Sequence, residues 1–137
     1  MSVHQDIDGS LLPRVNAAPR ALVFLTVPWS GPERAARSAF LVAAKALAAE
    51  HEGLGVECYS MDEEADWCQK WLATLGVPQI GGGIPHGAGS MLWLELGRVV
   101  AHAIDGSQLN PSIILSRTRA LWAKPPKSDA AVDNRGA

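Results

Sequence analysis

The sequence predicts a single α/β domain in which a central mixed β-sheet is flanked by helices. Two short apolar runs, rich in β-branched and aromatic residues, each precede a helical pattern, and two further β-rich runs precede a last helical pattern. Strands that alternate with helices indicate parallel pairing, whereas the last two runs, separated by a glycine, indicate a hairpin. With 137 residues, 47 % of them apolar, the chain can bury one core.

The first strand and helix are defined by an apolar run and a capping pattern. Ala21–Val27 is continuously apolar, and its length suits a strand buried on both faces. Ser30 followed by Glu33 has the spacing of a capping box, in which the two side chains satisfy backbone N–H groups at the start of a helix. The helix is expected to run through Glu50 or His51, where glycines follow.

The second strand and helix follow directly. Val56–Met61 alternates as a buried strand, and Asp62 is expected to cap a helix over Glu63–Leu75. Trp67 and Trp71 lie one turn apart on this helix. Such a pair usually packs into or beside the core, whereas an exposed pair would form a partner surface.

The second half of the domain begins with a loop. Gly76–Gly89 contains six glycines and two prolines. The runs Met91–Leu96 and Arg98–Ile104, separated by Gly97, predict the hairpin. Asn110-Pro111 then begins the final helix, with proline at its first position.

The two ends of the chain are polar and differ from the domain between them. Residues 1–19 are expected to be an N-terminal arm, with a short extended piece at Leu11–Val15. The domain itself is expected over residues 20–123. Residues 124–137, which include Pro125-Pro126, are predicted to be a disordered tail.

The junction between the first strand and its helix reads Trp29-Ser30-Gly31-Pro32-Glu33-Arg34. Thioredoxins carry Trp-Cys-Gly-Pro-Cys-Lys at this place, so the tryptophan, glycine, proline and a basic residue match. Gly97 in the hairpin and Gly106 before the last helix also fit that family. The sequence therefore resembles the thioredoxin superfamily over about residues 20–122, and this resemblance implies a thioredoxin-like fold.

The residues that carry the family's dithiol chemistry are replaced in this sequence. Dithiol exchange needs a thiolate at the helix start, where the dipole lowers its pKa, but Ser30 holds that position and Glu33 holds that of the resolving cysteine. The family's buried aspartate corresponds to Phe24, which is expected in the core of a central strand. The place of its cis-proline falls near Gly89, with Pro85 upstream, so whether a cis-proline is retained stays open.

Two cysteines and four histidines leave few alternatives for chemistry. Cys58 and Cys68 could be a relocated redox pair, but two buried thiols are the better interpretation because free cysteine is usually buried. Ser30 and Glu33 as nucleophile and base are less favoured than a helix cap. No metal site or cofactor is expected, because the histidines lack ligand spacing and Gly81–Gly83 lacks a following Gly-Lys-Ser/Thr.

Charge and hydropathy exclude other classes of function. A formal net charge of -2 gives no support for binding to nucleic acid or to a membrane surface. No apolar run approaches the ~18 residues of a membrane span, and the N-terminus does not resemble a secretory signal. We therefore expect a cytoplasmic location.

The predicted function is that of a redox-inactive protein-binding or assembly module. In thioredoxin-like proteins the junction loop and the loop before the hairpin form a surface for extended peptide segments, and the resemblance implies the same surface here. The residues expected to contact a protein or extended peptide are Trp29, Ser30, Pro32, Gly83, Pro85, His86 and Gly89. The alternatives are a thiol-disulfide oxidoreductase that uses Cys58 or Cys68, and a structural subunit with its interface elsewhere, such as the helix of Trp67 and Trp71. The sequence predicts neither the partner nor the oligomeric state.

Overall fold

The computed structural model describes residues 3–27, 31–49, 54–77, 89–103 and 106–123. Five strands form one sheet in the order β1-β3-β2-β4-β5. The strands are β1 (Val3–Asp6), β2 (Ala21–Thr26), β3 (Glu57–Asp62), β4 (Met91–Glu95) and β5 (Arg98–Ala103). β1, β3 and β2 are parallel, whereas β4 is antiparallel to both β2 and β5. The predicted mixed sheet is therefore confirmed.

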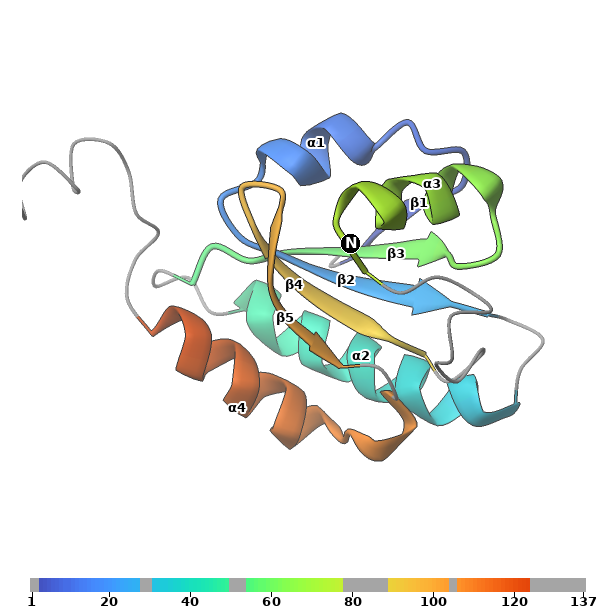
Figure 1. Cartoon of the computed structure of the whole chain (residues 1–137). Helices are drawn as coiled ribbons and strands as arrows, with labels where there is room; N and C mark the ends of the chain where they lie inside the picture. Colours follow the sequence, from blue (N-terminus) through green and yellow to red (C-terminus); the bar gives the residue numbers. More distant parts are fainter. Residues whose placement is uncertain (1–2, 28–30, 50–53, 78–88, 104–105, 124–137) are drawn as a thin grey trace, which may run out of the picture.

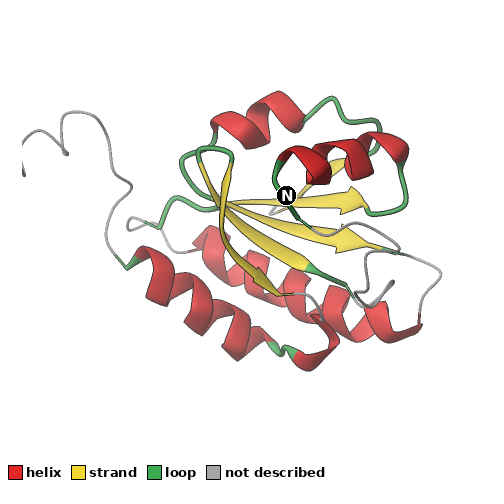
Figure 2. Ribbon diagram, viewed as in Figure 1, coloured by secondary structure: helices red, strands yellow, loops and turns green. Residues whose placement is uncertain are grey.

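Helices cover both faces of this sheet (Figure 1 and Figure 2). They are α1 (Leu12–Ala17), α2 (Gly31–Ala49), α3 (Asp66–Thr74) and α4 (Pro111–Trp122), with a short 3-10 turn at Gly106–Gln108. α1 and α3 lie on one face, and α2 and α4 lie together on the other. The parallel strands and their crossover helices thus form one half of the domain, and the hairpin with α4 forms the other.

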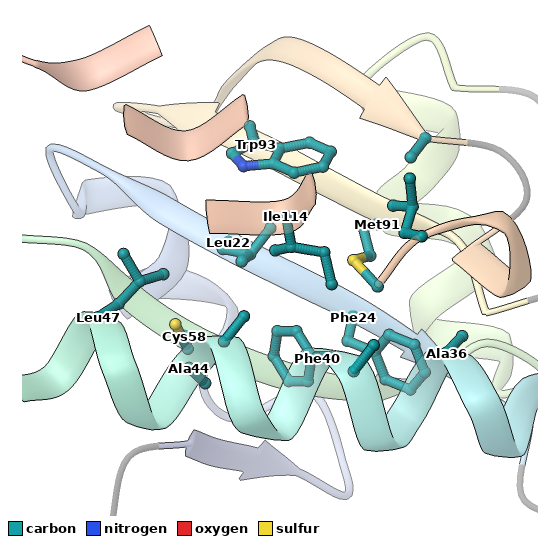
Figure 3. Close-up of a cluster of buried hydrophobic side chains, with 14 of the residues drawn as sticks. Leu22, Phe24, Ala36, Phe40, Ala44, Leu47, Cys58, Met91, Trp93 and Ile114 are labelled. Atoms are coloured by element: carbon teal, nitrogen blue, oxygen red, sulfur yellow. The ribbon is translucent and has the colours of Figure 1, made fainter. Parts of the chain in front are cut away.

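The core consists of two clusters, one on each face of the sheet. β2 is central, and its residues Ala21 to Leu25 are all buried because helices cover it from both sides. On the α2/α4 side, the ring of Phe24 stacks on that of Phe40 with centroids 5.0 Å apart (Figure 3). Buried Trp93 on the same side donates its indole N–H to Thr118 at 2.9 Å. The prediction that Phe24 is a core residue is confirmed.

The first nineteen residues contradict the expectation of an arm. Val3–Asp6 pairs in parallel with β3 as an edge strand, and Leu12–Ala17 is helical, so the extended piece predicted at Leu11–Val15 is wrong. Proline is tolerated in the first turn of a helix, where Pro13 stands, and Val15 is buried beneath it. The carboxylate of Asp6 fixes the connection, since it accepts backbone N–H bonds from Asp8, Gly9 and Leu11 at 3.2, 2.7 and 3.1 Å.

α3 begins later than predicted. The N–H of Glu63 donates to the carbonyl of Thr26 at 3.0 Å, which extends the contact between β3 and β2 past the last strand residue. Asp62 accepts from the N–H of Glu64 at 3.0 Å and therefore stabilises a turn, and the residue before the helix is Ala65, which makes no side-chain cap. Asp62 is thus a turn residue and not the predicted N-cap.

The remaining elements agree with the sequence to within one or two residues. α2 ends at Ala49, and the hairpin turns at Leu96 and Gly97. Asn110 caps α4 by accepting from the N–H of Ile113 at 2.9 Å, as predicted. The tail predicted at residues 124–137 lies outside the described residues.

Candidate functional site

The predicted binding surface lies where β2 ends and α2 begins, beside the segment that leads into β4. Trp29, Ser30, Gly83, Pro85 and His86 lie outside the described residues, as does the side chain of Pro32. Gly89 is described, and so are the residues that hold the end of β2 against α2. These described residues define the geometry of the junction.

Glu33 is the residue that joins β2 to α2. It stands in the first turn of α2 and is completely buried. One carboxylate oxygen accepts the backbone N–H of Val27 at 2.8 Å and the hydroxyl of Thr26. The other lies 2.9 Å from Nε and 2.7 Å from Nη2 of Arg37, one turn further along the helix.

These contacts explain why an anionic side chain is stable in the core. The guanidinium of Arg37 supplies a compensating charge, and the strand supplies two further donors. The start of a helix also favours a negative charge. Because both oxygens are occupied by these groups, Glu33 acts as a structural clasp. Its other predicted partner, the N–H of Ser30 in a capping box, lies outside the described residues.

Gly89 has a different role from the one predicted. It is buried with φ of +76°, a left-handed conformation that favours glycine. A Cβ atom there would lie 2.6 Å from Cβ of Ala36 and 3.1 Å from the ring of Phe24. Packing inside the domain therefore requires glycine here, and the expectation that Gly89 contacts a partner peptide is wrong because the residue is buried.

The two cysteines lie on opposite faces of the sheet. Cys58, on β3, faces the α2/α4 side, where Figure 3 shows it near Ala44. Cys68, on α3, belongs to the cluster on the α1/α3 side. Both are free and buried, as predicted. Burial raises the pKa of each thiol to about 12, and for Cys68 the nearby carboxylates of Glu63, Asp62 and Asp6 contribute to the increase. The sheet therefore separates two protonated thiols.

Comparison with solved structures decides the fold. Thioredoxin from Trypanosoma brucei brucei superimposes with a TM-score of 0.61 over 87 % of this chain and 89 % of that chain, at 15 % identity. The chain has the thioredoxin fold. A mutant thioredoxin from Halobacterium salinarum NRC-1 gives a TM-score of 0.59 over 86 % and 88 % of the two chains, at 13 % identity. The zinc-bound form of human ERp44 gives 0.60 over 86 % of this chain and 30 % of that chain, at 11 % identity.

Sequence comparisons add nothing further. No protein-family model matches the chain, and no curated protein matches it. Identities this low show the fold alone. The chemistry of this thioredoxin fold must therefore be argued from its own residues.

The tryptophan pair on α3 is used for packing. Trp71 is buried, and its indole N–H donates to the side-chain oxygen of Asn16 at 3.1 Å. Trp67 is half-buried, and its ring lies against Gly9, where an added Cβ would be 3.1 Å away. The pair thus fastens α1 and the β1–α1 connection to α3. Core packing, the simpler of the two interpretations, is confirmed.

A polar cluster on β1, β3 and α1 was not predicted. Glu57 accepts from the hydroxyl of Tyr59 and pairs with Arg14 at 3.2 Å, and Arg14 lies 3.3 Å from Nε2 of His4. Because a guanidinium can only donate, a hydrogen bond between these two groups requires the His4 tautomer in which Nε2 is the acceptor. Burial, followed by the hydrogen bond and charge of Glu57, raises the pKa of Tyr59. No sequence signal reveals the cluster, because it depends on pairing between β1 and β3.

The described residues contain neither a candidate metal site nor a helix that could span a membrane. Within residues 3–27, 31–49, 54–77, 89–103 and 106–123, no group of three or more His, Cys, Asp or Glu side chains could hold a metal ion. In the same part of the chain, no helix is both long and apolar enough to cross a membrane.

Proposed function

We propose that this chain is a redox-inactive thioredoxin-like module that binds an extended segment of a partner protein. The observation that carries the proposal is that Glu33, which the sequence match aligns with the resolving cysteine of thioredoxins, is engaged by Thr26, Val27 and Arg37. A carboxylate at this position cannot form a disulfide, and Ser30 offers no thiolate to attack one. Both partners of the dithiol mechanism are therefore replaced.

The arrangement of the cysteines weakens the oxidoreductase alternative. Exchange requires a thiolate that meets its partner sulfur, and redox cysteines have lowered pKa values and partial exposure. Cys58 and Cys68 are instead buried on opposite faces with pKa values raised to about 12. Buried free thiols also suit a reducing compartment, which supports our expectation of a cytoplasmic protein.

The proposed binding surface consists of the expected residues Trp29, Ser30, Pro32, Gly83, Pro85 and His86, without Gly89, which is buried against Ala36 and Phe24. Two described contacts hold the elements that flank this surface. The Glu33 clasp holds the end of β2 against α2, and the N–H of Leu25 donates to the carbonyl of Ser90 at 2.9 Å, which fixes the segment before β4. Flanking elements that are already fixed lower the entropy cost of binding, and an extended guest could pair with backbone groups as an added strand.

A reductase assay tests the absence of redox chemistry. We expect no turnover of insulin disulfides in the presence of dithiothreitol, with an ordinary thioredoxin as the positive control. Turnover comparable to that control, abolished by Cys58→Ser or Cys68→Ser, would show that the chain is an oxidoreductase.

Replacement of Trp29 tests the binding surface, because aromatic residues are over-represented among interface hot spots. Partners captured from the native host and then purified should bind Trp29→Ala more weakly by at least ~1 kcal/mol, while its thermal unfolding stays unchanged. Undiminished binding of the same purified partners by a folded Trp29→Ala would move the site elsewhere.

A further inference from the structure

In its described residues, the outer surface of the α2/α4 layer carries several cations and no exposed carboxylate. α2 contains Arg34, Arg37 and Lys45, and α4 contains Arg117 and Arg119. The one acidic residue in the two helices is Glu33, which is buried and paired with Arg37 at 2.7 Å. The charge that this layer presents to solvent is therefore positive, although the whole chain has a net charge of -2.

Aliphatic side chains lie among these cations. Leu41, Val42, Ile113 and Leu121 are exposed by 47 %, 53 %, 36 % and 38 %, and they are four of the seven large exposed hydrophobic residues in the described part of the chain. The exposed positions between them are mostly small: Ala35, Ser38, Ala48, Ala49, Ser112, Ser116 and Ala120. Small residues let another backbone approach closely, so this face can accept a further layer of structure.

The opposite face has the reverse charge. The segments that lead into α1 and α3 expose Asp8, Asp62, Glu64 and Asp66. The cations of those two helices are each paired with a carboxylate, Arg14 with Glu57 at 3.2 Å and Lys70 with Asp66 at 3.0 Å. Because α2 and α4 lie on one side of the sheet and α1 and α3 on the other (Figure 1), the sheet separates a basic, partly aliphatic face from an acidic one.

We propose that the outer face of α2 and α4 is a second interaction surface, which binds an acidic amphipathic helix of a partner protein. Carboxylates along the borders of the apolar stripe of such a helix would meet Arg34, Lys45 and Arg117, and the stripe itself would cover the aliphatic residues. A helix suits the geometry because it adds to a layer of two packed helices by ridges-into-grooves contacts. This surface shares no residue with the binding surface proposed above, so it does not depend on the function proposed there.

Two other occupants fit the face less well. The acidic face of a second copy lies on the far side of its own sheet, so self-association would be head-to-tail and open-ended. An anionic bilayer would attract the cations, but the large exposed hydrophobic residues of the described chain include no aromatic side chain that could anchor the face at the headgroup level.

The test uses the full chain, labelled with ¹⁵N, and a synthetic helical peptide of about 20 residues, a length that matches α2. The peptide has a stripe of Leu flanked on both borders by Glu, and a counterpart has Lys in place of Glu. The test variant is Lys45→Glu/Arg117→Glu. Its matched control, Arg14→Glu/Lys70→Glu, changes the net charge equally on the opposite face. Val42→Ser tests the apolar contribution, and Trp29→Ala tests independence from the junction.

We expect saturable binding of the acidic peptide, with amide shifts confined to α2 and α4. Lys45→Glu/Arg117→Glu should raise Kd about tenfold or more, whereas its control and Trp29→Ala should change it less than about twofold; Val42→Ser should raise it severalfold. Absence of saturable binding, equal binding of the basic peptide, or shifts elsewhere would overturn the proposal. Phosphatidylserine vesicles that bind this face in place of the peptide would also overturn it, as would self-association in sedimentation that the test variant abolishes.

Discussion

At the scale of single residues, Glu33 has the greatest effect on how the candidate site is interpreted. Its sequence position suggests a capping box, but its described contacts run to β2 and to Arg37. Sequence spacing reveals local pairs such as Glu33 with Arg37, four residues on, whereas the contacts with Thr26 and Val27 depend on how the chain reverses between strand and helix. The sequence therefore predicts that the resolving cysteine is missing, but not what its replacement does.

Replacing Glu33 should destabilise the fold. Glu33→Ala leaves the N–H of Val27 and the hydroxyl of Thr26 without their acceptor, and Arg37 without its counter-ion. Loss of one member of a buried pair costs about 3–5 kcal/mol, and we expect about 2–4 kcal/mol because the side chain of Arg37 is 38 % exposed. Glu33→Gln, which keeps one acceptor oxygen, should cost less. Guanidinium unfolding measures both, and a neutral Glu33→Ala would show that the clasp contributes nothing.

The substitution of glycine by alanine should affect stability differently at two positions. A Cβ at Gly106 would lie 1.9 Å from the carbonyl oxygen of Gly89, so Gly106→Ala forces the segment before β4 away from α2 and should cost about 1–3 kcal/mol or more. Gly31, at the start of α2, has nothing within 4 Å of its added Cβ. Gly31→Ala should therefore be close to neutral, because the added Cβ meets no residue other than its chain neighbours, while Pro32 limits the gain in helix propensity. Thermal unfolding that ranks the two variants equally would contradict this packing.

At the scale of elements, the predicted boundaries were correct where a local sequence signal marks them. α4 has Asn110 and Pro111 at its start, and the hairpin has Gly97 at its turn. β1 was missed because a strand of four residues gains its stability from pairing with β3, more than fifty positions away. The start of α3 was misplaced because the backbone of Glu63 bonds to β2, and tertiary contacts of this kind override local capping preferences.

The turn of the hairpin contains one residue in a strained backbone conformation, and a substitution can relieve this strain. Leu96 has φ of +48° and Gly97 has φ of +80°, as in a type I′ turn, where Asn-Gly is preferred. Leu96 is 63 % exposed, so its side chain contributes little to the core. Leu96→Asn should stabilise the fold by about 1 kcal/mol, because asparagine tolerates the left-handed region.

Leu96→Ala is the matched control for this turn. Alanine removes the same exposed leucine but meets the same left-handed strain, so its unfolding midpoint in guanidinium should stay near that of the wild type. An alanine variant as stable as the asparagine variant would mean that the exposed leucine, and not its backbone conformation, limits stability.

At the scale of the whole molecule, the sheet separates two environments. One face buries Cys58 and Phe24 under α2 and α4, and the other buries Cys68 and Trp71 under α1 and α3. The order of elements predicts this layered sheet from sequence. The separation of charge between the two outer faces depends on which residues of each helix are exposed, and it became visible only in three dimensions.

The pH dependence of stability should reflect a histidine at the hairpin edge of the sheet. His102 on β5 pairs with Leu92 of β4, and burial lowers the pKa of its imidazole from the ordinary value of 6.5. Below pH 6.5 the unfolded chain therefore binds a proton that the folded chain does not, so the stabilising contribution of this site is complete above 6.5 and is lost as the pH falls through the lowered value. His102→Gln removes this titration while the other histidines remain. Between about pH 7 and pH 5, the free energy of unfolding should fall more steeply for the wild type than for His102→Gln in urea titrations. Parallel pH profiles for the two proteins would show that His102 is as accessible to protons in the folded chain as in the unfolded one.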